Sequence, residues 1–200
     1  MKRLAVLVSG RGTNLMALDR AMRDGSMPAS LALVGADREA PALRWAEAQG
    51  ITTFFADARR LGMPAWEQEL LAALEDAAVD AVVLAGFLRI LSPSFVERFA
   101  GRIVNVHPSL LPAFPGLDGI GQAMRYGAKV TGVTVHFVDQ GLDAGPIILQ
   151  EALPVLGGET RAELETRVHA IEHRLLPEAL RLLVLGRLEL EGRIVHIAEG

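Results

Sequence analysis

The most constraining feature of this sequence is the alternation of two periodicities over its first 107 residues. Short, continuously apolar runs are typical of strands buried on both faces, and between them lie segments whose apolar residues recur at helical spacing. Leu4–Val8 (LAVLV) is such a run, and the turn Ser9–Asn14 separates it from the helical pattern of Leu15–Met22. Strands and helices alternating at this interval predict right-handed βαβ crossovers and a mostly parallel sheet.

The same alternation continues to residue 107. Further strands are predicted at Ser30–Val34, Ile51–Phe55, Ala81–Leu84 and Ile103–His107, and helices at Ala42–Gln49, at Trp66–Ala78 and after the N-cap and proline pair Ser92-Pro93. The predicted fold class is therefore α/β, a Rossmann-like, mostly parallel, twisted sheet with helices on both faces.

After residue 107 the pattern changes. Pro108–Leu117 contains three prolines and is predicted to be a stiff loop. Val130–Val138 and Pro146–Val155 are rich in β-branched residues, which favours two long strands that extend the sheet. A helix that begins with the capping box of Thr160 and runs to about Val184, followed by a hairpin at Leu188–Ile197, is predicted to complete the chain.

Length and composition limit the classes of protein that need to be considered. We find no repeat or linker in the 200 residues and expect a single domain, 1–200, with two halves, 1–107 and 108–200. The formal charge of −4 argues against a nucleic-acid partner. The absence of cysteine excludes disulfides, thiolate metal sites and cysteine nucleophiles. The apolar runs are too short for a signal peptide or membrane span, so we expect a cytoplasmic protein without a membrane partner.

The first candidate site is the turn Ser9–Asn14 (SGRGTN). Its two glycines allow a sharp turn with exposed backbone amides, and the N-terminus of the following helix favours negative charge, so a phosphate could bind there. The dinucleotide-binding fingerprint requires a third glycine where Leu15 stands, so a mononucleotide-type phosphate fits better than NAD. A tight turn without a ligand is the alternative.

The second candidate site is the segment Asn105–Ser109 (NVHPS). Residues two apart in a strand face the same side, so Asn105 and His107 are predicted to project together at the carboxyl end of the sheet, where open α/β sheets bind ligands. An amide beside an imidazole suits stabilisation of an oxyanion together with proton transfer. The alternative is a histidine that only caps the strand end through hydrogen bonds.

The third candidate is Asp143, in the turn LDAGP. A carboxylate near His107 would favour the charged imidazolium and make it a general acid at neutral pH. The alternative is an aspartate that stabilises its own turn.

Three other histidines and one glutamate require an interpretation. His136 lies inside a predicted strand, which favours a hydrogen-bonded core histidine over a catalyst. His169 and His173 are spaced i, i+4 on the long helix, but no HExxH pattern surrounds them and no metal is expected. Glu172, on the same helix, is either a surface charge or a group that holds a ligand hydroxyl.

Five segments together resemble the folate-dependent formyltransferase family. They are SGRGTNL from Ser9, VVLAGFLRILSPSFV from Val82, IVNVHPSLLPAFPG from Ile103, GVTVHFVDQGLDAGPIILQ from Gly132 and RVHAIEHRLLP from Arg167. The resemblance covers essentially the whole chain and implies the formyltransferase fold, with a ribonucleotide-binding half, 1–107, and a folate-binding and C-terminal half, 108–200. It further implies transfer of the formyl group of 10-formyltetrahydrofolate to the amine of N1-(5-phosphoribosyl)glycinamide in purine biosynthesis, by direct attack and a tetrahedral intermediate.

The resemblance also implies a set of site residues. Asn105, His107 and Asp143 would be catalytic, whereas Gly12, Thr13 and Asn14 would surround the phosphate and Glu172 would contact the same substrate. Folate would bind Leu88, Arg89, Ile90 and Leu91, together with Asn105 and Asp139, Gln140, Gly141, Leu142 and Asp143. No metal is implied, the partners would be small molecules, and the chain would be a monomer or weak homodimer.

The sequence departs from the family pattern at two places. Met63 stands where relatives commonly carry an arginine on the folate side, with only Arg59 and Arg60 nearby, which leaves the folate contacts open. Many relatives have a pair of histidines after PGL, where this chain has Asp118–Gly121. Those histidines are either dispensable for the core reaction or replaced by other groups.

Three alternative functions remain open. Another formyltransferase or a formyl-folate hydrolase could share this fold, although such relatives generally carry an extra domain. A non-catalytic nucleotide-binding module could use the same first loop. An NAD-linked oxidoreductase would need an acidic residue at the end of the second strand, and Asp37 lies there.

Overall fold

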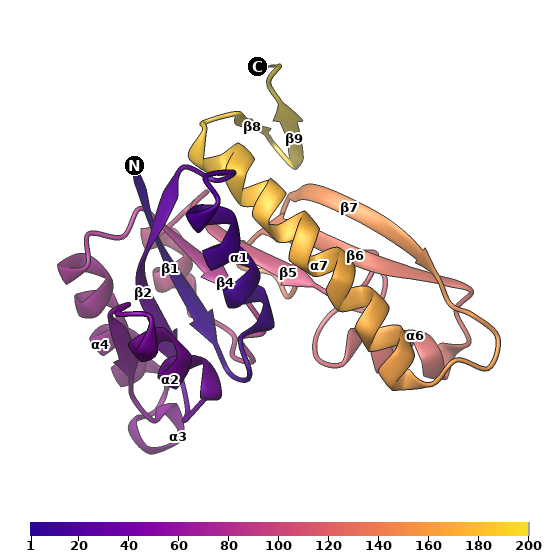
Figure 1. Ribbon diagram of the computed structural model, residues 1–200, viewed down its shortest axis with the longest axis horizontal. Coiled ribbons are helices and arrows are strands. Elements are labelled where there is room, and N and C mark those ends of the chain that lie inside the picture. Colours follow the sequence, from indigo (N-terminus) through magenta and orange to yellow (C-terminus); the bar gives the residue numbers. More distant parts are fainter. Residues whose placement is uncertain (200) are drawn as a thin grey trace. The chain divides into compact units, whose positions relative to one another are not determined.

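The computed structural model describes residues 1–199 and divides into two compact units, Met1–Val104 and the part from Asn105 onward (Figure 1). The elements of the first unit are β1 (Lys2–Val8), α1 (Thr13–Arg23), β2 (Ala29–Ala36), α2 (Pro41–Ala48), β3 (Thr53–Phe55), α3 (Ala58–Leu61), α4 (Met63–Asp76), β4 (Ala81–Leu84) and α5 (Pro93–Arg98). Those that follow are β5 (Ile103–His107), α6 (Gly119–Tyr126), β6 (Val130–Phe137), β7 (Ile147–Pro154), α7 (Arg161–Val184), β8 (Leu188–Glu191) and β9 (Ile194–Ile197).

The strands form a seven-stranded sheet of order β3-β2-β1-β4-β5-β6-β7 and a separate hairpin, β8-β9. β1 pairs in parallel with both β2 and β4, and β2 pairs in parallel with β3. All five residues of the apolar run Leu4–Val8 are completely buried, as expected for a central strand covered on both faces. The predicted α/β fold class, with a mostly parallel sheet, is confirmed.

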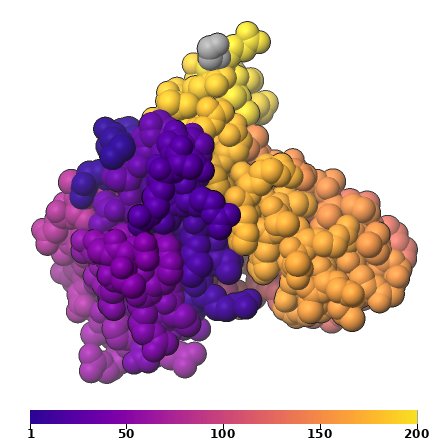
Figure 2. Space-filling model, viewed as in Figure 1, coloured from indigo at the N-terminus to yellow at the C-terminus, as the bar shows by residue number. Residues whose placement is uncertain are grey.

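In the second unit β6 and β7 pair antiparallel, and the long helix α7 packs on both of them. The side chains of α7 cover much of this unit on the face shown in Figure 2. Thr160 begins the helix with the predicted capping box, in which its side chain accepts from the backbone of Glu163 while the Glu163 carboxylate accepts from the Thr160 backbone. No helix among residues 1–199 is long and apolar enough to cross a membrane.

Three helices differ from the prediction, and one of these, the four-residue helix α3, was not predicted. The helix predicted at Trp66–Ala78 spans Met63–Asp76, because Pro64 suits its first turn and Gly62 serves as the N-cap. The short helix α6 was not predicted, since two glycines in its first three residues lower its intrinsic helix propensity. Asp118 compensates by capping it, with Oδ1 accepting from the Gly121 amide at 3.2 Å.

Candidate active site

Asn105 and His107 occupy alternate positions of β5. Asn105 lies between the buried residues Val104 and Val106, and His107 is the last residue of the strand. His107 is buried and Asn105 is half-buried. Both side chains contact the carboxyl group of Asp143, so both project to the same side of the strand, as its two-residue period predicts.

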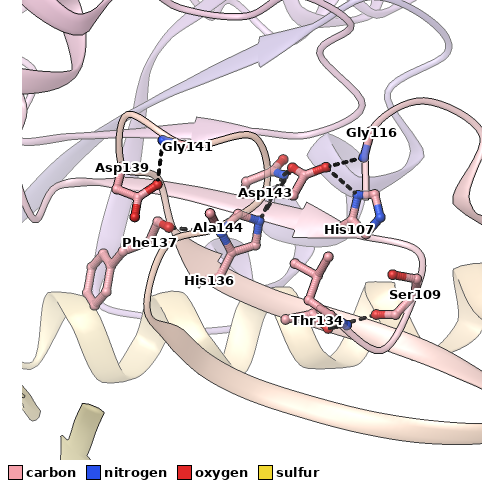
Figure 3. Close-up of polar contacts among 12 residues, drawn as sticks. His107, Ser109, Gly116, Thr134, His136, Phe137, Asp139, Gly141, Asp143 and Ala144 are labelled. Atoms are coloured by element: carbon pink, nitrogen blue, oxygen red, sulfur yellow. Dashed lines mark hydrogen bonds and ion pairs between the residues drawn. The ribbon is translucent and has the colours of Figure 1, made fainter. Parts of the chain in front are cut away.

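Asp143 lies in the connection between β6 and β7, and its carboxyl group faces His107 (Figure 3). Its Oδ2 is 3.3 Å from Nδ1 of His107 and accepts a hydrogen bond from the Gly116 amide at 2.7 Å. Its Oδ1 accepts from Nδ2 of Asn105 at 3.3 Å. The amide, imidazole and carboxylate named from separate sequence motifs therefore converge in one cluster.

The backbone around Asp143 is held in a demanding conformation. Asp143 itself has a φ of 47°, in the left-handed region that few non-glycine residues adopt. A Cβ at Gly145 would lie 1.8 Å from the carbonyl oxygen of Phe137, so only glycine allows the ends of β6 and β7 to approach this closely. This close approach places the Asp143 carboxyl group beside β5.

Both ring nitrogens of His107 face hydrogen-bond acceptors. Nε2 is 2.8 Å from the carbonyl oxygen of Phe114, and Nδ1 faces the Asp143 carboxylate. A neutral imidazole carries one proton and can satisfy only one of these acceptors, whereas the imidazolium satisfies both. The geometry therefore favours a charged His107 paired with Asp143.

His136 adds a fourth polar group to the cluster. Its Nδ1 is 2.8 Å from the Phe137 carbonyl oxygen, which can only accept, so Nδ1 carries the proton and Nε2 accepts from Nδ2 of Asn105 at 3.1 Å. Burial lowers the pKa of His136, and the Phe137 hydrogen bond and the Asp143 charge offset this only in part. The two amide protons of Asn105 thus point to His136 and Asp143.

The sequence interpretation of His136 was correct on burial and hydrogen bonding but missed its contact with the predicted site. A register shift between Val135 and His136 interrupts the pairing of β6 with β7 at this point, and such bulges redirect side chains. A usable signal was present, because Thr134 and His136 are polar residues two apart in the otherwise apolar segment Val133–Val138.

A second polar network fixes the proline-containing loop that follows β5. Thr134 is completely buried, and its hydroxyl donates to the Ser109 carbonyl at 2.7 Å while accepting from the Leu111 amide at 3.1 Å. Gln150 donates to the Leu111 carbonyl at 2.8 Å. These bonds anchor the loop that carries the Phe114 carbonyl to His107.

In the first unit, the predicted phosphate loop ends at the N-terminus of α1. Gly12 is the N-cap, with a φ of 77° and no side-chain cap, so the amides of the first turn lack a capping side chain. A Cβ at Gly12 would lie 2.7 Å from Cβ of Ala42, which excludes larger residues from this turn. Thr13 and Asn14 are the first residues of the helix.

The predicted folate segment Leu88–Leu91 lies between β4 and α5. Leu88 and Ile90 are exposed, at 50% and 75%, whereas Leu91 is buried and the Arg89 guanidinium pairs with Asp37. The segment therefore presents two apolar side chains outward from an anchored backbone.

Asp37 follows β2 directly, at the position where a dinucleotide-binding protein holds a ribose hydroxyl. Its carboxylate is completely buried and is bonded to Ser9, Arg38 and Arg89. With both oxygens already engaged, this group does not suit ribose recognition, which weakens the oxidoreductase alternative.

Glu172 lies on a different element, α7, and is buried rather than a surface charge. Its Oε2 is 3.0 Å from Nδ1 of His169, whose ring stacks on that of His173. Among residues 1–199 no group of three or more potential ligand side chains could hold a metal ion.

The two departures from the family pattern have clear positions. Met63 is the first residue of α4, and Arg59 and Arg60 are exposed on α3. Asp118, besides capping α6, forms ion pairs with Arg125 at 2.9 Å and Arg161 at 3.0 Å. Asp118 thus links α6 to α7.

Comparison with known proteins identifies the family. The family model described as formyl transferase matches residues 2–180. The chain belongs to the formyl transferase family. The predicted resemblance and enzyme class are thereby confirmed.

Individual relatives match this formyl transferase over nearly its whole length. Phosphoribosylglycinamide formyltransferase of Mycobacterium tuberculosis is 44% identical over 203 residues, covering 98% of this chain and 94% of the relative. The crystal structure of glycinamide ribonucleotide transformylase 1 from Symbiobacterium toebii is 46% identical with a TM-score of 0.96, covering 100% of this chain and 95% of that one. A formyltetrahydrofolate deformylase from Pseudomonas syringae is 25% identical with a TM-score of 0.91, and this chain covers 67% of it.

Proposed function

We propose that this formyl transferase moves the formyl group of 10-formyltetrahydrofolate to the amine of N1-(5-phosphoribosyl)glycinamide. Relatives named phosphoribosylglycinamide formyltransferase or glycinamide ribonucleotide transformylase match 92% to 100% of the chain. The observation that carries the chemical proposal is the convergence of Asn105, His107 and Asp143, with both nitrogens of His107 facing acceptors.

The reaction needs no covalent bond to the protein. The amine nitrogen attacks the formyl carbon, a new C–N bond forms, and the carbonyl electron pair moves to oxygen to give a tetrahedral intermediate. When this intermediate collapses, the bond to the folate N10 breaks, the former amine has lost a proton and N10 has gained one. The protein must therefore stabilise one oxyanion and transfer one proton.

Asn105 and the imidazolium of His107 are the proposed donors to the oxyanion. In the ligand-free protein their N–H groups already bond to other acceptors, so the substrate oxygen must replace one acceptor of each. For Asn105 the longest of these bonds, to Asp143 at 3.3 Å, is the one most readily exchanged. This exchange would also free Oδ1 of Asp143 to accept the proton that leaves the amine.

The remaining binding groups follow the family pattern. We assign the backbone of Gly12, Thr13 and Asn14 to the phosphate and Glu172 to the same substrate. We assign folate to Leu88–Leu91 and Asp139–Asp143. The proposal treats the chain as one functional domain that acts as a monomer or weak homodimer in the cytoplasm, without a metal.

A direct assay tests the proposal. Purified protein is incubated with 10-formyltetrahydrofolate, with and without phosphoribosylglycinamide, and both the formylated product and free formate are measured. We expect product only when the acceptor is present, and little formate in its absence. Rapid formate release without the acceptor would instead indicate a hydrolase, the activity named for the deformylase of similar fold.

A further inference from the structure

Asp37 occupies an unusual position for a charged group that the proposed reaction does not use. It follows β2 and is 0% exposed. Its Oδ1 accepts from the Ser9 hydroxyl at 2.7 Å, and its Oδ2 accepts from Nε of Arg89 and Nη2 of Arg38, each at 2.8 Å. A single buried carboxylate thus joins three separate segments of the first unit.

Two of these segments are also bonded directly to each other. The Ser9 hydroxyl, besides donating to Asp37, accepts from the Leu88 amide at 3.1 Å. The Ser9 amide donates to the Gly86 carbonyl at 3.2 Å. Ser9 opens the turn 9–14 that we assign to the phosphate, and Leu88 and Arg89 belong to the segment that we assign to folate.

The Asp37 carboxylate is ionised despite its burial. Burial alone would raise the pKa of Asp37, but the hydrogen bonds from Arg38, Arg89 and Ser9 outweigh it and lower the pKa to about 2. A buried charge is tolerated only while its partners stay in place. Movement of either Ser9 or Arg89 therefore affects the whole hydrogen-bonded group.

We propose that Asp37 is a positioning residue that couples the phosphate turn 9–14 to the folate segment 88–91, so that occupancy of one orders the other. This inference rests on the proposed function for the identity of the two ligands. The coupling is reciprocal by thermodynamic necessity, so bound ribonucleotide should tighten folate binding by the same factor as folate tightens ribonucleotide binding.

A second buried carboxylate offers a matched comparison. Glu67 on α4 is 5% exposed, and its Oε1 accepts from the Ser92 amide at 2.7 Å, just beyond the folate segment. Both carboxylates therefore anchor the same segment, but only Asp37 also contacts Ser9. Loss of Glu67 should loosen the segment without affecting the phosphate turn.

Amide hydrogen exchange of the ligand-free protein tests the physical link independently of activity. In Asp37→Asn we expect exchange to accelerate at least tenfold in both peptides, 9–14 and 86–91. In Glu67→Gln we expect acceleration only around 86–92. Asp80→Asn, at the opposite end of the strands where Asp80 accepts from the Arg3 amide at 2.8 Å, should leave both peptides unchanged. Unchanged exchange at 9–14 in Asp37→Asn would overturn the inference.

The effect of one substrate on binding of the other provides the second test of the inference. With the wild-type protein, saturating phosphoribosylglycinamide should slow exchange at 86–91 and lower the Kd of a folate analogue at least fivefold, at the lower end of typical allosteric factors. In Asp37→Asn this factor should fall to about one, and adding Arg89→Leu should cause no further loss of coupling. If this change in Kd persists in Asp37→Asn, Asp37 does not transmit the coupling and the inference is refuted.

If Asp37→Asn does not fold, the same two measurements are made on Ser9→Ala. This variant removes only the hydroxyl that bridges Asp37 and Leu88. The two hypotheses fail separately. A wild-type protein that makes no formylated product but shows the expected exchange pattern disproves the proposed function and leaves the link between the two segments intact. If the wild-type protein makes the formylated product but hydrogen exchange is unaltered in the variants, only the link between the two segments is disproved.

Discussion

At the scale of single residues, the cluster around Asp143 is defined by which atoms can donate and which can only accept. The Phe137 carbonyl fixes the proton of His136 on Nδ1, which turns its Nε2 into an acceptor for Asn105. The two ring nitrogens of His107 face the Phe114 carbonyl oxygen and the Asp143 carboxylate, both of which can act as acceptors. The protonation states thus follow from the partners rather than from the histidines themselves.

Replacing the amide of Asn105 should affect turnover more than binding. Asn105→Ala is expected to lower kcat by about 10²- to 10³-fold, because one donor to the developing oxyanion is lost, with a small change in KM. Steady-state kinetics with each substrate varied in turn measures both parameters. Near wild-type turnover in both Asn105→Ala and His107→Ala would contradict the mechanism.

The charge of Asp143 should control the pH dependence of the reaction. Asp143→Asn removes the anion beside Nδ1 of His107, so the imidazolium loses its partner and kcat should fall, with the alkaline limb of the pH–rate profile displaced to lower pH. Profiles are measured between about pH 5 and pH 9, with Asp57→Asn, at the half-buried N-cap of α3, as a control. An unchanged profile in Asp143→Asn would exclude this role.

At the scale of elements, the β6–β7 connection determines where the Asp143 carboxyl group lies. The two strands were predicted from their β-branched residues, and their antiparallel pairing is observed. The register shift at His136 and the left-handed backbone at Asp143 were not predicted, because both depend on how closely the strand ends approach each other. Local propensity does not encode that distance.

A methyl group at Gly145 tests this close approach. Gly145→Ala places Cβ against the Phe137 carbonyl, so the strand ends must separate, and we expect about 1–3 kcal/mol of destabilisation together with loss of activity. Gly157→Ala is the matched control, since nothing lies within 4 Å of its added Cβ. Urea unfolding and kcat are compared for both, and equal behaviour of the two variants would refute the steric argument.

At the scale of the whole molecule, two buried groups make stability depend on pH in the same direction. Burial lowers the pKa of His136 below its ordinary 6.5, so the folded protein prefers the neutral ring. This contribution is present above about pH 6.5 and is lost as the pH falls through the lowered value. Asp37, with its pKa lowered from 3.8 to about 2, contributes above about pH 4, and that contribution is lost as the pH falls towards 2.

The free energy of unfolding should therefore decrease in two separate ranges of acid pH. His136→Gln should flatten the decrease that begins near pH 6.5, and Asp37→Asn should remove the lower-pH component, about 2 kcal/mol from its pKa change. Urea unfolding at intervals between about pH 8 and pH 2 measures both. A His136→Gln curve parallel to that of the wild type would show that the buried ring does not titrate on unfolding.

The sequence by itself determined the order of the strands and the longer helices, the caps at Ser92 and Thr160, and the residue types of the candidate site, because periodicity and capping depend on neighbours along the chain. Only the tertiary structure decided which buried polar groups meet. Asn105 and Asp143 are 38 positions apart, and the partners of His136 and Asp37 likewise come from other strands and loops. Buried polar atoms take whichever donors and acceptors packing brings near them, and local sequence does not specify those neighbours.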